Sequence, residues 1–132
     1  MTENQYKRKN TSVSLINYHF VFCPKRRKRV LVNGVSRRLE EIIYQKAKEL
    51  ECDVLALEIM PDHVHLFISC HPLIARYQIM FRIKGASSRI LRKEFPHLLK
   101  LPSLWSRSYY CGTAGSVSSE TIKKYIANQN SH

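Results

Sequence analysis

Two apolar segments separated by a tight turn constrain the fold of this 132-residue chain more than any other feature. The segments 53–60 and 63–71 each have the length and the apolar content of a strand. Pro61 and Asp62 stand between them, and tight turns favour these two residue types. We therefore expect two neighbouring antiparallel strands, and the run of apolar residues in the second segment predicts a buried position at the centre of a sheet.

The remaining segments surround this pair in a recognisable order. Apolar spacing, turn residues and a serine cap predict a strand over 14–23, a helix over 36–50, a helix over 74–95, a strand over 108–113 and a final helix from about Ser118. The order matches the split βαβ plan. We therefore expect an α+β fold with a ferredoxin-like (RRM-like) antiparallel sheet, helices on one face of it, and an added C-terminal helix. A single domain over residues 1–132 is predicted, with the polar, basic residues 1–12 as a mobile tail.

The charge of the chain indicates a polyanionic partner. Twenty-two Lys and Arg oppose ten Asp and Glu, which gives a formal net charge of +12. Nucleic acid is the expected partner, although a ribosomal or merely cationic protein has the same composition. The cations expected to contact a DNA backbone are Lys25, Arg26, Arg27, Lys28, Arg29, Arg82, Lys84 and Arg89.

Other composition features bear on the cellular compartment. No stretch approaches the 18 or so apolar residues of a membrane-spanning helix, and the N-terminal residues lack a hydrophobic signal core. Four scattered cysteines without a Cys-x-x-Cys pair fit small buried residues in a reducing compartment. We therefore expect a cytoplasmic protein without a membrane partner.

His63 and His65 are the strongest candidates for a functional site. Side chains two apart on a strand project from the same face, and two adjacent imidazoles suit a divalent transition-metal ion. The alternative is that one or both are structural histidines bonded to backbone. Strand parity predicts that Asp62 points to the opposite face, which makes it a supporting residue or an alternate ligand. A zinc site that adds Cys70 and His71 has poor geometry, because Cys70 has the opposite parity.

The predicted C-terminal helix carries two further candidates. Tyr125 and Gln129 are four residues apart and therefore lie on one face of that helix. Since Ile122 and Ile126 share the same helical pattern, Tyr125 could equally be the amphipathic edge of a packed helix. A two-metal, three-carboxylate mechanism is disfavoured, because the chain has only two aspartates and eight glutamates.

Four segments resemble the HUH superfamily, and within it the small single-tyrosine, IS200-like transposases of insertion sequences that move as single-stranded DNA. The matching segments are 18–25, 57–66, 104–113 and 122–129, in the family's order and almost end to end. The resemblance implies that His63 and His65 bind the metal, that Gln129 is the third ligand and that Tyr125 is the nucleophile.

The resemblance also implies a reaction and an assembly. Element ends, folded as hairpins in the family's manner, would be nicked and rejoined through a 5′-phosphotyrosine with Mg²⁺ or Mn²⁺ as the metal. A homodimer is expected, with Tyr125 placed in trans beside the partner's histidines or in cis. Two related enzymes remain as alternatives: a domesticated nuclease that cuts palindromes and a replication initiator. A non-catalytic RRM-like module would need an aromatic and basic RNP signature, which the central strands lack.

Overall fold

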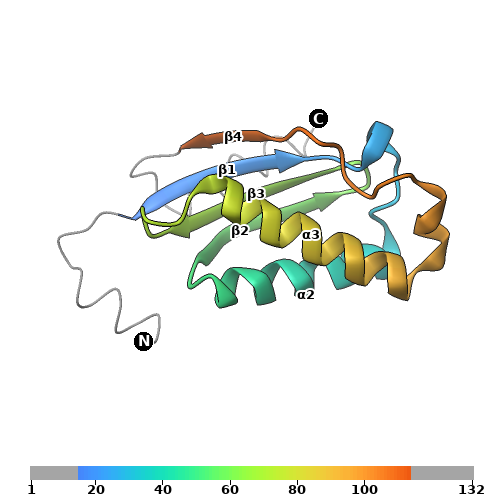
Figure 1. The fold of residues 1–132 in the computed structure, drawn as a ribbon, viewed down its shortest axis with the longest axis horizontal. Coiled ribbons are helices and arrows are strands. Elements are labelled where there is room, and N and C mark those ends of the chain that lie inside the picture. The colour runs from blue at the N-terminus through green and yellow to red at the C-terminus, as the bar shows by residue number, and fades with distance from the viewer. Residues whose placement is uncertain (1–14, 114–132) are drawn as a thin grey trace.

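A four-stranded antiparallel sheet with two helices on one face forms the described part of the protein (Figure 1). The structure, a computed structural model, describes residues 15–113. The strand order in the sheet is β2-β3-β1-β4. The strands and helices are β1 (Ile16–Phe22), α2 (Asn33–Glu49), β2 (Asp53–Met60), β3 (His63–Cys70), α3 (Arg76–Glu94) and β4 (Tyr110–Thr113), and 3-10 turns span Lys25–Arg27 and Pro96–Lys100.

This arrangement confirms the predicted ferredoxin-like plan. The connection from β1 to β2 passes through α2 and skips one strand position, which β3 fills between them. β2 and β3 pair across the Pro61–Asp62 turn, with Met60 opposite His63. β3 is central and buried along nearly its whole length, as its apolar composition predicted. The predicted C-terminal helix lies outside the described residues.

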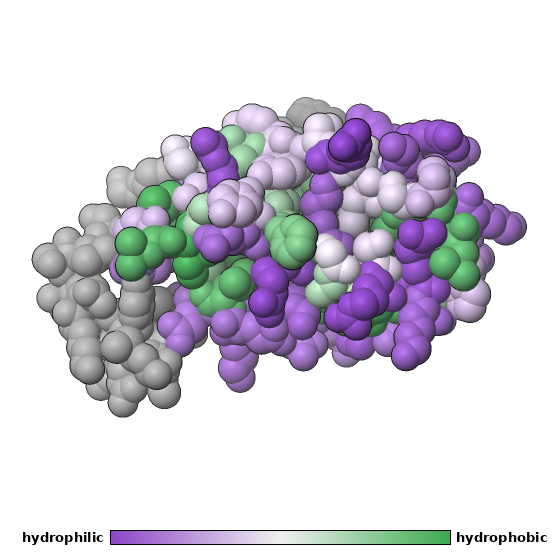
Figure 2. Space-filling view, in the orientation of Figure 1, coloured by the Kyte–Doolittle hydropathy of each residue, from purple (hydrophilic) through white to green (hydrophobic). Residues whose placement is uncertain are grey.

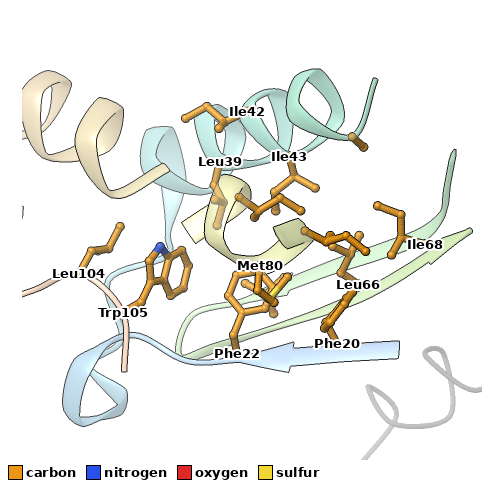
Figure 3. Packing of buried hydrophobic residues seen from close by; sticks show 14 of the residues in the cluster. Phe20, Phe22, Leu39, Ile42, Ile43, Leu66, Ile68, Met80, Leu104 and Trp105 are labelled. Atoms are coloured by element: carbon orange, nitrogen blue, oxygen red, sulfur yellow. The ribbon is translucent and has the colours of Figure 1, made fainter. Parts of the chain in front are cut away.

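The core lies between the sheet and the two helices (Figure 3). Alternate residues of β1 are buried there, among them Phe20 and Phe22, and Phe20 pairs with Leu66 of β3. Helix α2 covers them with the stripe that includes Leu39 and Ile43. Because the core takes every second residue of β1 and of β3, the residues between them face the other side of the sheet.

Helix α2 begins three residues earlier than the sequence predicted. Its first residue is Asn33, and Gly34 lies inside the first turn instead of preceding the helix. A Cβ atom at Gly34 would come within 3.2 Å of the Phe95 ring at the end of α3. Gly34 therefore permits a close approach between the two helices, which explains a glycine at a position that helices otherwise disfavour.

Trp105 anchors the segment that leads to β4. The indole is buried, and its Nε1–H donates to Ser87 Oγ on α3 at 2.9 Å. Trp105 also forms a β-bridge with Pro24, just after β1, and the Lys84 ammonium donates to Ser106 O at 2.6 Å. These contacts hold the start of β4 and the turn after β1 against the same helix. No helix within residues 15–113 is long and apolar enough to cross a bilayer.

Candidate metal centre

His63 and His65 lie side by side on the face of the sheet opposite the helices. His63 is the first residue of β3, and its side chain is 23% exposed. His65 is buried, and the two ring centroids are 5.1 Å apart with the ring planes nearly perpendicular. The alternation of β3 thus places both imidazoles on the same face, at the end of the strand that adjoins the turn.

The Asp62 carboxylate binds His63, contrary to the parity argument. Asp62 Oδ1 is 2.7 Å from His63 Nδ1. The parity prediction was wrong because β2 ends at Met60 and β3 begins at His63, so Asp62 belongs to the turn, where strand alternation does not apply. The hydrogen bond with His63, followed by the charge of Arg27, lowers the pKa of Asp62 below its ordinary value. The carboxylate is therefore ionised at neutral pH.

The cationic run after β1 is joined to this turn through Arg27. Its guanidinium donates to Asp62 Oδ2 at 3.1 Å. Arg26 and Arg27 both adopt left-handed backbone conformations, with φ of 59° and 52°. The Lys25 amide donates to Leu104 O at 2.8 Å, which fixes the start of the turn. The run that the sequence predicts to contact a DNA backbone thus begins with a tight turn, which brings one of its cations to the carboxylate beside His63.

His65 has a different partner, the imidazole of His19 on β1. His19 Nε2 is 3.1 Å from His65 Nδ1, and the two rings are roughly stacked. Burial, and then the charge of His65, lower the pKa of His19 to about 4. Burial, and then the charge of His63, also lower the pKa of His65. Both rings are therefore neutral at pH 7, which is the form that binds metal ions.

The hydrogen bonds determine which ring nitrogens face a ligand. In both histidines Nδ1 has the partner, Asp62 for one ring and His19 for the other, and this leaves Nε2 as the metal-binding nitrogen of each. Nε2 of a neutral imidazole is a common metal ligand. The pair therefore fits a divalent ion, although no group of three or more His, Cys, Asp or Glu within 15–113 is arranged to hold one. Tyr125 and Gln129 lie outside the described residues.

Cys70 and His71 take no part in this cluster. Cys70 is buried in the core on the helix side of β3, and a hydrogen bond with Cys52 and burial raise the pKa of its thiol. His71 Nδ1 accepts a hydrogen bond from the Leu73 amide at 3.1 Å. Both residues lie at the far end of β3 from His63, which agrees with the prediction that they do not form a zinc site.

The predicted DNA-contacting cations differ in their surroundings. Arg26, Lys28, Arg29 and Arg89 are exposed, and Lys25 is partly buried. Arg82 pairs with Glu49 at 2.9 Å. Lys84 is half-buried and donates to main-chain oxygens, so it supports the segment before β4. The helix-covered face is largely hydrophilic, with small apolar areas between polar side chains (Figure 2).

The sequence and fold are similar to those of known transposases. A family model described as "Transposase IS200 like" matches residues 12–129. The chain is 35% identical over 117 residues to the ISDra2 transposase TnpA of Deinococcus radiodurans. The aligned residues cover 86% of this chain and 84% of that protein. It is 29% identical over 115 residues to the transposase of insertion sequence element IS200 from Salmonella typhimurium, with 85% of this chain and 75% of that protein covered.

Two solved structures have the same fold. A Deinococcus radiodurans transposase crystal structure matches with a TM-score of 0.73 and 36% identity, over 89% of this chain and 92% of that chain. A REP-associated tyrosine transposase solved with a REP hairpin matches with a TM-score of 0.57 and 14% identity, over 86% and 63% of the two chains. The extent of the family match and the identity to these relatives show that the chain belongs to the IS200-like transposase family.

Proposed function

We propose that the protein nicks and rejoins single-stranded DNA at the ends of an insertion sequence, in a metal-dependent reaction with a 5′-phosphotyrosine intermediate. The observation that carries the proposal is the pair His63 and His65. Both rings share one face of β3, and each has its Nδ1 atom held by a second side chain. Such paired and oriented imidazoles favour a metal centre over two isolated structural histidines.

In this proposal His63, His65 and Gln129 hold one divalent cation, Mg²⁺ or Mn²⁺. The bound cation supplies Lewis acidity and orients the scissile phosphate. The Tyr125 phenolate oxygen attacks phosphorus, a tyrosine–phosphorus bond forms, and the bond from phosphorus to the 3′-oxygen breaks. That oxygen takes up a proton and leaves as a free 3′-hydroxyl. A DNA 3′-hydroxyl reverses the step when it attacks the phosphotyrosine, so strands are rejoined without a nucleotide cofactor.

The surrounding residues have supporting roles. Asp62 accepts from His63 and fixes the ring, and Arg27 holds the carboxylate from the other side. The exposed cations Arg26, Lys28, Arg29 and Arg89 bind the DNA backbone. Arg82 contributes less, because its guanidinium is paired with Glu49.

We further propose that the protein acts as a homodimer in the cytoplasm of a bacterial or archaeal cell. Two element ends must be cut and exchanged together, and a dimer provides two active sites for this. The substrate ends are single-stranded and fold as hairpins; a transposase with this fold was solved bound to a REP hairpin, which supports that expectation. Tyr125 of one subunit works beside His63 and His65 of the other.

Replacement of the histidines tests the metal centre. His63→Ala and His65→Ala are expected to lose Mn²⁺-stimulated nicking of a labelled single strand from the element end. Gln129→Ala is expected to lose less, because water can take the vacant position. His97→Ala is the matched control, since His97 is exposed and lies on the 3-10 turn after α3. Nicking at the wild-type rate by both His63→Ala and His65→Ala would refute the assignment.

A further inference from the structure

We propose that His19 is a positioning residue for the metal ligand His65, which it orients by accepting a hydrogen bond from the Nδ1–H group. The inference deepens the proposed metal centre and rests on it. His19 Nε2 lies 3.1 Å from His65 Nδ1, and this contact links β1 to β3 through two buried or half-buried rings. His19 is neither one of the proposed ligands nor the nucleophile.

The chemistry of imidazole gives the contact a direction. A neutral ring that binds a metal ion through Nε2 carries its proton on Nδ1 and donates from there. Nε2 of His19 must then accept, so the proton of that ring resides on its own Nδ1. A ligand histidine with its second nitrogen held in this way has a fixed tautomer and orientation.

The same arrangement occurs at the other ligand with a different acceptor. His63 Nδ1 contacts the Asp62 carboxylate at 2.7 Å, so one ring has an anionic acceptor and the other a neutral one. A carboxylate beside buried His65 would carry an ionic desolvation cost that an imidazole avoids. Each of the two rings is thus held by a second side chain from a neighbouring segment, the turn in one case and β1 in the other.

The His19 ring is itself held in place by its neighbours. It stacks on Phe67, with centroids 4.1 Å apart and an angle of 8° between the ring planes. The Tyr110 ring of β4 lies at 71° to it, with the two centroids 5.6 Å apart. Gly112 pairs with His19 across the sheet. A Cβ atom at Gly112 would come within 2.6 Å of Tyr110 Oη, so the glycine leaves room for that ring. The acceptor nitrogen is therefore presented from a packed aromatic cluster.

Two substitutions separate hydrogen bonding from packing. His19→Phe keeps a flat ring on Phe67 but has no acceptor, whereas His19→Gln loses the ring but places an amide oxygen where Nε2 stood. Mn²⁺ affinity is measured by titration calorimetry on both variants and the wild type, with His97→Phe as the control. His19→Phe is expected to bind Mn²⁺ about 10- to 100-fold more weakly than the wild type. The affinity of His19→Gln for Mn²⁺ is expected to remain within about threefold of the wild-type affinity.

A second measurement reads the hydrogen bond without metal or activity. Long-range ¹H–¹⁵N spectra of the metal-free wild-type protein are expected to show His65 protonated on Nδ1 and His19 accepting through Nε2. His65 protonated on Nε2, unchanged affinity in His19→Phe, or equal losses in the two variants would each overturn the inference. Absence of Mn²⁺ binding by the wild type would refute the metal centre itself, while the tautomer of His65 would still decide the hydrogen bond.

Discussion

Removal of the Asp62 carboxylate should weaken metal binding by a predictable amount. Asp62 Oδ1 lies 2.7 Å from His63 Nδ1, a length typical of a charge-assisted hydrogen bond. Such bonds contribute about 1.5–3 kcal/mol, and a tenfold change in a dissociation constant corresponds to about 1.4 kcal/mol. We therefore expect Asp62→Ala to raise the dissociation constant for Mn²⁺ by about 10- to 100-fold, which agrees with the usual effect of losing an outer-shell partner.

Two further variants identify the cause of this loss. Asp62→Asn keeps an oxygen that accepts from His63, so its loss should be below about tenfold. Arg27→Gln removes the ion pair with Asp62, in which the arginine side chain is 63% exposed. Exposed pairs contribute about 0–1 kcal/mol, so Arg27→Gln should change the affinity by at most about fivefold.

Titration calorimetry with Mn²⁺ on the four proteins measures these differences directly. Thermal unfolding of each variant shows whether the fold is intact. Wild-type affinity in Asp62→Ala would refute the positioning role of the carboxylate. Equal, large losses in Asp62→Ala and Asp62→Asn would instead show that Asp62 is a direct ligand.

Two other predictions concern DNA binding and assembly. Replacement of Arg26, Lys28 and Arg29 by Gln should reduce the slope of log affinity against log salt for single-stranded DNA by about 2, since each neutralised phosphate contributes about 0.7. An unchanged slope would show that these side chains face solvent and do not contact the DNA phosphates. A heterodimer that combines a subunit lacking both proposed histidine ligands with a Tyr125→Phe subunit should recover cleavage, with the DNA attached to the histidine-deficient chain. Heterodimers that bind DNA but remain inactive would indicate assembly in cis.

The sequence predicted the fold well because strand alternation and helical spacing are local properties. The bounds of β2 were predicted to the residue, and those of β3 to within one residue. The start of α2 was misplaced because Gly34 is a strong local signal for a break, whereas the contact that explains it, with Phe95, is between two helices. Trp105 anchors the segment before β4 through Ser87 of α3, a partner that the local sequence could not reveal.

The site was predicted less completely, because its supporting contacts join distant segments. His63 and His65 follow from alternation within one strand. His19 was missed as a partner, since its proximity to His65 depends on the register in which Val21 faces His65 across β1 and β3. A histidine between the alternating core residues of β1 was the only local sign. Asp62 was assigned to the wrong face because it lies one residue before the start of β3, in the turn, where strand alternation does not apply.

The covalent intermediate provides the most direct test of the central claim. Wild-type protein is incubated with Mn²⁺ and a single strand from the element end, and the adduct is isolated under denaturing conditions and digested for mass spectrometry. We predict a peptide with a 5′-phosphonucleotide on Tyr125, no adduct from Tyr125→Phe, and DNA affinity in that variant within about twofold of the wild type, because only a hydroxyl is removed and the cationic surface is unchanged. An adduct on Tyr109 or Tyr110, or one that persists in Tyr125→Phe, would contradict the account.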